Sequence, residues 1–203
     1  MRPIEVIDGE VAKLDALAPA GYFFALRVRG ASPFMVFKTF PQAWLDLYME
    51  NGYMMRDPVT TWALTVGGTI RWSSPFLPDP FGVLRQAADY GLKYGASVAI
   101  GPRSALSICS ICRQDREPTK EEIAEAKEIV QKLHDLTEPP KSLSAEEKAL
   151  LLAADKGASA ARVAEKAGLS EAAARAKLKE LCDVFVVSAP EDALRRARDA
   201  KLL

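Results

Sequence analysis

The sequence predicts an α+β fold: an α-β-α sandwich domain, in which helices flank a small and mostly antiparallel sheet, followed by a small all-α domain of four helices. Two observations lead to this prediction. Over the first 136 residues, short segments of alternating apolar and polar residues are mixed with amphipathic helical segments, a mixture typical of α+β domains. After two prolines at 139–140, alanine-rich helical segments replace the strands. Adjacent prolines stop a helix and stiffen a connection.

The strands of the sandwich are predicted from runs of β-branched and aromatic residues that end at turn residues. The first run is the clearest, because apolar side chains alternate along it from Tyr22 to Val28. Glycine pairs or glycine followed by proline mark the later turns. The predicted strands cover residues 21–28, 34–40, 69–73, 97–100 and 105–111.

The helices of the same domain are predicted from their start signals and apolar periodicity. The strongest start is Asp57-Pro58, an N-cap carboxylate followed by proline at the first helical position. Thr119 and Glu122 form a capping box before another helix. Two further predicted helices cover 7–17 and 82–93, and one begins at Pro41. A small sheet covered by helices has room for a ligand between its layers.

Residues 137–142 are predicted to link a domain of residues 1–136 to a domain of residues 143–203. Serine caps and glycine stops divide the second domain into short helices, and its last helix is predicted over 191–203. A helix, a glycine turn and a second helix form the helix-turn-helix arrangement. The predicted caps and stops are Ser144 with Glu147, Gly157, Ser159, Gly168 and Ser170.

The charges give only weak guidance toward nucleic acid. From residue 141 onward there are 12 basic against 10 acidic residues, and the first 140 residues carry 15 against 17. This asymmetry has the sign expected of a DNA-binding C-terminal domain. No apolar run approaches the ~18 residues of a membrane helix, and the first residues lack a signal-peptide pattern. We therefore expect a cytoplasmic protein that does not enter a membrane.

The three cysteines and single histidine leave little material for metal or redox chemistry. Cys109 and Cys112 lie in a segment predicted as a strand, where residues three apart point to opposite faces. This geometry favours two unrelated thiols over a redox pair, which normally opens a helix. His134 comes late on a helix and is expected at the surface, where its charge would favour the helix dipole. We expect no metal site, no catalytic residue and no cofactor.

Four chemically different positions in the sandwich domain occur at spacings that match a known family. The second lies four residues after the first, the third nine beyond it, and the last fifteen after the third. They are Trp44, Tyr48, Asp57 followed by Pro58 and Val59, and Trp72. This pattern resembles the signature of the autoinducer-binding domain of LuxR-type acyl-homoserine-lactone receptors, which are quorum-sensing transcription regulators. Residues 87–95 resemble a second segment of that family.

The resemblance implies an N-acyl-homoserine lactone as the ligand. This molecule offers carbonyl acceptors, an amide N–H donor and an apolar chain, and each such polar group left unpaired on burial costs about 1–3 kcal/mol. The resemblance implies that Trp44 donates to the ring carbonyl and that Asp57 accepts from the amide N–H in a charge-assisted bond. Tyr48 and Trp72 would wall the ring and the proximal acyl chain, and Val59 completes this part of the predicted site.

The sequence departs from the family at one hydroxyl. Phe40 stands where the family often has a tyrosine whose hydroxyl meets the amide carbonyl, and phenylalanine cannot donate. Ser110 stands at the position of a serine or threonine in the family and is predicted to supply that hydroxyl. Both residues are included in the predicted ligand site.

Each of these residues, taken singly, has an ordinary structural explanation. Trp44 and Tyr48 at helical spacing are equally typical of a core, and Asp57 could serve only as an N-cap. The joint spacing is what favours a binding site.

Residues 143–203 resemble the four-helix DNA-binding domain of the same family, in a degenerate form. The predicted recognition helix is rich in alanine, which offers base edges only methyl contacts. Its basic side chains suit phosphates, although the same charges are also ordinary on a solvated helix face. The predicted DNA-binding residues are Ser170, Arg175, Lys177 and Lys179.

The leading hypothesis is a ligand-responsive transcriptional regulator that binds a small-molecule autoinducer and DNA as a homodimer. The alternative is a dimerising antagonist that no longer binds DNA and forms hetero-oligomers with a full-length relative. An enzyme acting on the lactone is disfavoured, because the pocket region has no histidine, no metal cluster and no Gly-x-Ser-x-Gly motif.

Overall fold

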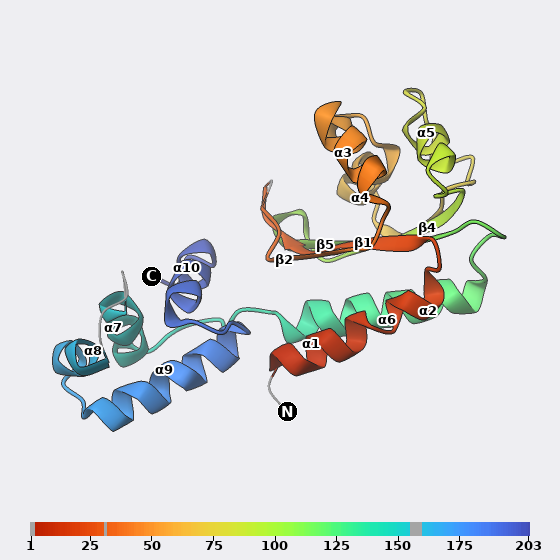
Figure 1. Ribbon diagram of the computed structural model, residues 1–203. Helices are drawn as coiled ribbons and strands as arrows, with labels where there is room; N and C mark the ends of the chain where they lie inside the picture. The colour runs from red at the N-terminus through yellow and green to blue at the C-terminus, as the bar shows by residue number, and fades with distance from the viewer. Residues whose placement is uncertain (1–2, 31, 155–159) are drawn as a thin grey trace. The chain divides into compact units, whose positions relative to one another are not determined.

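The computed structural model describes residues 3–30, 32–154 and 160–203 of the chain (Figure 1). Contacts divide the chain into two compact units. One comprises Ile7–Asp135 and is called the α/β unit; the other comprises Met1–Val6 and Leu136–Leu203 and is called the helical unit. The functional boundaries at residues 136–137 and 142–143 stay a prediction.

The α/β unit is built on one five-stranded sheet with the strand order β2-β1-β5-β4-β3. Every recorded strand pair is antiparallel, which confirms the expected sheet type. The second strand is shorter than predicted and the fourth begins three residues earlier. The strands are β1 (Gly21–Val28), β2 (Met35–Lys38), β3 (Gly68–Arg71), β4 (Tyr94–Ile100) and β5 (Leu106–Arg113).

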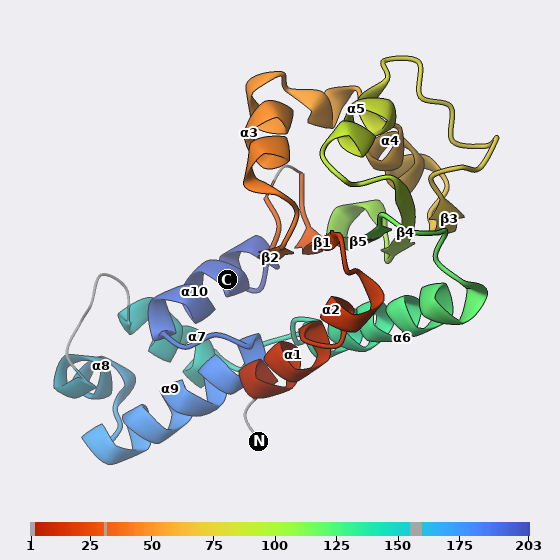
Figure 2. The same cartoon turned by 45° about the vertical axis from the view of Figure 1, so that its right-hand side comes forward.

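Helices cover both faces of this sheet. In Figures 1 and 2, α3, α4 and α5 lie over one face and α6 runs along the other. The observed helices are α1 (Pro3–Val11), α2 (Leu14–Leu17), α3 (Gln42–Glu50), η1 (Tyr53–Met55), α4 (Pro58–Thr65), α5 (Val83–Asp89), η2 (Arg103–Ala105) and α6 (Lys120–Leu136). The chain therefore has the predicted order of layers, helix, sheet and helix, within this unit.

The predicted helix starts after Asp57 and Thr119 are confirmed, whereas three predicted helix extents are wrong. The last predicted helix, over 191–203, is observed as Pro190–Asp199. Asp57 caps α4 and Thr119 exchanges both capping-box bonds with Glu122. The helix predicted over 7–17 begins earlier, at Pro3, because proline suits a first helical position. It is also interrupted after Val11, which gives α1 and α2. The helix predicted over 82–93 stops at Asp89, because Gly91 turns with a φ of 88°, which favours glycine.

His134 is buried, and its expected surface position is wrong. Only 7% of this residue is exposed, and its Nδ1 lies 2.8 Å from Ser107 Oγ on β5. The Arg27 guanidinium donates to the His134 carbonyl from Nε at 3.0 Å and from Nη2 at 2.6 Å. The ring also packs so closely on Gly101 that a Cβ there would overlap it. Packing of α6 on the sheet therefore places the histidine in the interior.

The helical unit packs four helices around one apolar core. Ser144 and Glu147 form the predicted capping box, Gly168 turns with a φ of 67°, and Ser170 caps the next helix. The predicted roles of Gly157 and Ser159 lie outside the described residues. The helices are α7 (Ala145–Ala153), α8 (Ala160–Ala167), α9 (Glu171–Phe185) and α10 (Pro190–Asp199). The assignment of α8 and α9 as a helix-turn-helix stays a prediction.

Gly95 on β4 provides the space that the Trp72 side chain occupies. A Cβ built on Gly95 would overlap three ring atoms of Trp72. The backbone of Trp72 is also fixed there, because its N–H donates to the Gly95 carbonyl at 2.8 Å. The absence of a side chain at residue 95 therefore determines where this indole lies.

We predict that Gly95→Ala lowers the free energy of unfolding by about 1–3 kcal/mol, the usual cost of overpacking a core. Adding Trp72→Phe should recover part of the loss, because the smaller ring relieves the overlap. Urea unfolding measures both effects. Gly9→Ala is the matched control, since a Cβ there meets no atom within 4 Å. A Gly95→Ala protein as stable as the parent would contradict this assignment.

Candidate functional site

The predicted ligand-site residues gather on the sheet face beneath α3, α4 and α5, where two apolar clusters meet. The first cluster comprises buried Trp44, Tyr53, Val83, Ala87, Leu92 and Cys112, with Phe40, Leu47, Tyr48, Trp72 and Tyr90 packed against it. The second comprises buried Val59, Trp62, Ala63, Leu77, Ala99 and Leu106, with Ile70, Trp72, Leu84 and Ile108 against it. Trp72 packs on both clusters and joins them.

Trp44 lies at the centre of an aromatic group in the first cluster. Its ring centroid is 5.8 Å from Tyr48, 6.0 Å from Tyr53 and 5.7 Å from Tyr90. The residue is 4% exposed. Within the part of the chain that the structure describes, its indole N–H meets no hydrogen-bond acceptor. An indole N–H can only donate, so this one is suited to a ligand that supplies a carbonyl.

Asp57 joins the start of α4 to α3 through both carboxylate oxygens. Oδ1 accepts from the Val59 N–H at 2.8 Å, and Oδ2 accepts from the Tyr48 hydroxyl at 2.8 Å. Burial raises the pKa of Asp57, although the bonds from Tyr48 and from the backbone oppose this shift. Burial and the nearby carboxylate also raise the pKa of Tyr48. A carboxylate accepts about four hydrogen bonds, so capacity remains for a ligand N–H.

A second polar chain crosses the sheet face from Trp72 to Ser110. The Trp72 indole donates to Ser97 Oγ at 2.9 Å, and Ser97 Oγ lies 2.7 Å from Ser110 Oγ. Ser97 was missed by sequence reasoning. It lies directly opposite Ser110 in the β4–β5 pairing, a register that the sequence does not specify.

Two other polar side chains of the first cluster were also missed. The Tyr53 hydroxyl donates to Gln86 Oε1 at 2.7 Å, which joins η1 to α5. Tyr90 packs its ring on Trp44. The sequence shows both tyrosines but not their contacts, because their partners lie more than thirty residues away in the chain.

The two cysteines of β5 lie as predicted, on opposite faces of the sheet. Cys112 belongs to the first cluster, whereas Cys109 is three residues away and is also buried. Burial raises the pKa of both thiols, which keeps them protonated and poorly reactive.

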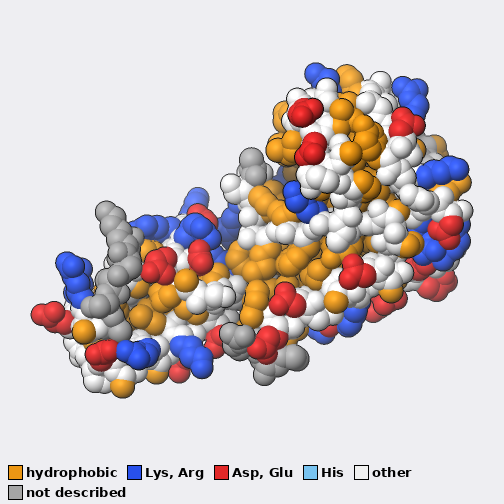
Figure 3. Space-filling view, in the orientation of Figure 1, with side chains coloured by type: hydrophobic (Ala, Val, Ile, Leu, Met, Phe, Trp, Pro, Cys, Tyr) orange, Lys and Arg blue, Asp and Glu red, His pale blue; other side chains and the backbone are white. Residues whose placement is uncertain are grey.

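The predicted DNA-binding residues lie between the N-cap of α9 and its ninth residue, Lys179. Ser170 uses its hydroxyl as an N-cap. Arg175 forms an ion pair of 2.6 Å with Glu171, and Lys177 forms one of 2.6 Å with Glu146 on α7. Within the face shown in Figure 3, basic and acidic side chains are intermixed over the helical unit.

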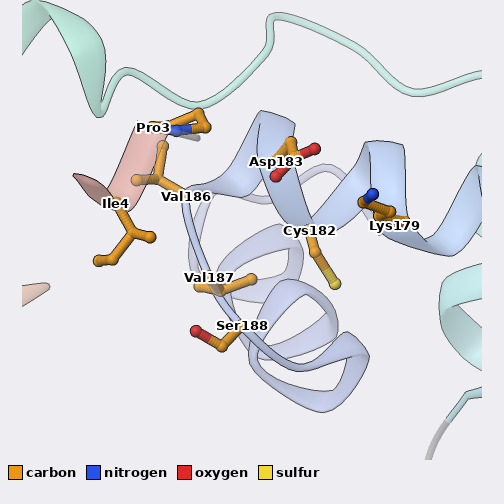
Figure 4. A pocket seen from close by; sticks show the side chains of 8 residues that line it. All are labelled: Pro3, Ile4, Lys179, Cys182, Asp183, Val186, Val187 and Ser188. Atoms are coloured by element: carbon orange, nitrogen blue, oxygen red, sulfur yellow. The ribbon is translucent and has the colours of Figure 1, made fainter. Parts of the chain in front are cut away.

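Lys179 has a different environment, at the wall of two cavities within the helical unit. The smaller, of about 110 Å³, is lined by Lys179, Cys182 and Asp183 from α9 and by Pro3 and Ile4, among others (Figure 4). The larger, of about 330 Å³, also has Arg175 in its wall. Over the described residues, Lys179 forms no ion pair.

The described ranges of the chain contain neither a metal-ligand group nor a membrane-spanning helix. No group of three or more His, Cys, Asp or Glu side chains there could hold a metal ion. None of the helices in those ranges has the length and apolar character needed to cross a membrane.

The chain is similar to known proteins along its whole length. It is 28% identical to the HTH-type quorum-sensing regulator RhlR of Pseudomonas aeruginosa, in an alignment that covers 100% of this chain and 92% of the relative. Its fold resembles the crystal structure of Escherichia coli SdiA, with a TM-score of 0.51 and 20% identity, over 100% of this chain and 92% of that one. Residues 16–136 match the family described as "Autoinducer binding domain". This match covers more than half of the chain, which therefore belongs to the autoinducer-binding-domain family of LuxR-type regulators.

Proposed function

We propose that this protein is a ligand-responsive transcriptional regulator that binds an N-acyl-homoserine lactone, or a closely related small molecule, in its α/β unit. In this proposal it binds DNA as a homodimer through its helical unit and acts in the cytoplasm without a cofactor. The observation that carries the proposal is the gathering of a free donor, Trp44, a carboxylate acceptor, Asp57, and a hydroxyl, Ser110, on one apolar sheet face.

The chemistry of the site supports this ligand class. Trp44 offers its N–H to the lactone carbonyl, Asp57 accepts from the amide N–H, and Ser110 donates to the acyl carbonyl. Tyr48, Trp72, Phe40 and Val59 supply the apolar walls, since they belong to or pack on the two clusters. Apolar walls with a few convergent polar groups are typical of small-molecule sites.

The DNA-binding half of the proposal rests on the helical unit. We assign residues 1–136 to ligand binding, 137–142 to a linker and 143–203 to a helix-turn-helix domain, with α9 as the recognition helix. Ser170, Arg175, Lys177 and Lys179 would contact DNA, chiefly at phosphates. The curated relative, described as an HTH-type regulator and aligned over the whole of this chain, supports this assignment.

One observation favours the second candidate, a dimerising antagonist that does not bind DNA. Two of the three basic residues proposed to contact DNA already have acidic partners, Glu171 for Arg175 and Glu146 for Lys177. Phosphates would have to displace these carboxylates. Both candidate functions require a dimer. Exposed apolar side chains on the α/β unit, such as Met49, Met55 and Phe76, offer a contact surface for it.

We predict that Trp44→Phe and Asp57→Asn each weaken the binding of N-octanoyl-homoserine lactone by about 1–3 kcal/mol, the scale of leaving a buried polar partner unpaired. Titration calorimetry measures this. Tyr53→Phe is the matched control, because it removes a hydroxyl of the same cluster that bonds to Gln86. Affinity unchanged in both variants would remove these two residues from the site.

We also predict opposite effects of Asp57→Asn on stability and on binding. Because burial raises the pKa of Asp57, the folded protein holds this proton to a higher pH than the unfolded chain does. Protonated Asp57 therefore makes its full contribution to the free energy of unfolding below the ordinary carboxyl pKa. This contribution is lost as pH rises through the raised pKa of Asp57. The ligand-free parent should lose stability across that window, whereas Asp57→Asn should not, while still binding ligand less well. Parallel stability curves for the two proteins, measured by urea unfolding, would contradict this.

For DNA, we predict a steep loss of affinity with salt and little discrimination among sequences, because phosphate contacts release counterions. Lys179→Ala should weaken binding to all sequences alike, and Arg175→Ala should reduce any preference. Glu146→Gln should strengthen binding by releasing Lys177. Arg195→Ala on α10 is the matched control. Gel shifts over a salt series measure these effects, and no binding at ~50 mM salt would reject the regulator in favour of the antagonist.

A further inference from the structure

The polar chain of Trp72, Ser97 and Ser110 lies in an otherwise apolar part of the α/β unit. Ser97 is 0% exposed and Ser110 is 6% exposed. Apolar side chains of both clusters flank the pair along β5, with Cys112 in the first cluster and Leu106 in the second. Trp72 packs on both clusters while its N–H donates to Ser97. Burial of two hydroxyls here is unfavourable unless each finds partners.

Counting the indole and hydroxyl protons shows that this row of hydrogen bonds lacks one acceptor. The indole N–H can only donate, so Ser97 Oγ must accept from Trp72. The two hydroxyls then share one hydrogen bond, of 2.7 Å, although they hold two protons. Neither forms any other side-chain hydrogen bond with the residues that the structure describes. Whichever hydroxyl donates to the other, one buried hydroxyl proton stays without an acceptor.

The hydrogen bond between Ser97 and Ser110 also has a preferred direction of donation. An oxygen that accepts from an N–H becomes a better donor, because successive hydrogen bonds polarise one another. Ser97 accepts from Trp72 and is therefore the better donor of the pair, which leaves the unpaired proton on Ser110. Ser110 is the serine placed in the ligand site by the proposed function.

We propose that Trp72, Ser97 and Ser110 form a hydrogen-bond relay that selects a hydrogen-bond acceptor on the ligand. Ser110 is the donor that contacts the ligand, and Ser97 is a positioning residue that orients the Ser110 hydroxyl. The inference rests on the proposed function and deepens it, because it adds Ser97 and the Trp72 N–H as the groups that direct the Ser110 proton toward the ligand.

The same count explains why an acceptor is selected over a donor. A ligand carbonyl beside Ser110 takes the remaining proton, and every member of the relay is then paired. A ligand N–H, which can only donate, would donate to Ser110 Oγ and leave one serine proton unpaired in the interior, which costs free energy. The acyl carbonyl of an acyl-homoserine lactone is such an acceptor, and Phe40 cannot donate to it.

The first arm of the test compares N-octanoyl-homoserine lactone with its thioamide, in which sulfur replaces the acyl oxygen and accepts weakly. Ser97→Ala and Ser110→Ala should each lower affinity for the amide about 5- to 10-fold, the scale of one net hydrogen bond. The double variant should lose little more than either single one, because the relay acts as a unit. Affinity for the thioamide should change less than about 2-fold in each. A merely structural role of Ser97 would weaken both ligands alike and overturn the inference.

The second arm needs no ligand and follows the indole N–H signals of the three tryptophans by nuclear magnetic resonance. Ser97→Ala should move the Trp72 signal toward that of an unbonded indole, and Ser110→Ala should move it less. Ser107→Ala is the matched control: it removes a buried serine hydroxyl from β5 that bonds to Arg27 and His134 instead. It should leave the Trp72 signal in place.

The two arms separate the failure of the inference from that of the proposed function. If Ser97→Ala leaves the Trp72 N–H signal unchanged, the inference of a relay is wrong, whichever ligand binds. A relay present in the spectra, with no binding of the lactone to the parent protein, overturns the ligand class and the assignment of Ser110 as its donor. Equal losses for amide and thioamide overturn acceptor selection while the lactone site stands.

Discussion

The pairing of β5 with β1 on one side and β4 on the other is the constraint on which the α/β unit depends. Residues alternate between the two faces of a strand, so this pairing sends neighbouring side chains of β5 to different layers. Ser110 meets Ser97 on the face covered by α3, α4 and α5, whereas Ser107 meets His134 of α6 on the other. A slip of one residue would exchange the two faces, and both polar contacts would be lost.

The polar groups of the candidate site are held mainly by one another, and each such contact joins separate segments. The Tyr48 hydroxyl ties α3 to the Asp57 cap of α4, and the Trp72 indole ties the end of β3 to Ser97 on β4. In a low-dielectric interior these bonds are strong, and an unpaired group is correspondingly costly. The spare proton of the two serines therefore stands out, and the Trp44 N–H also has no acceptor among the described residues. Such unsatisfied groups are typical of sites completed by a ligand.

The helical unit combines a well-formed core with a surface on which basic and acidic residues nearly balance. Its helices enclose Leu150, Leu151, Phe185 and Ala193, all fully buried. The ion pairs of Arg175 and Lys177 are exposed, and exposed pairs contribute only about 0–1 kcal/mol. DNA phosphates could displace such partners at little cost. Under the proposed function, the stability of these helices and their affinity for DNA are therefore separate properties, determined by different residues.

The sequence by itself determined the elements and the candidate residues of this protein. Its cap residues located the starts of α4, α6, α7 and α9, and its alternating segments located the strands. These signals are local, since a cap acts within one turn of its own helix. The spacing of Trp44, Tyr48, Asp57 and Trp72 indicated the family that the comparison with known proteins then showed. Only the tertiary structure decided which side chains meet. The contact of Ser97 with Ser110, the burial of His134 and the place of Trp72 against Gly95 depend on strand register and helix packing, which join residues far apart in the chain and leave no local pattern in it.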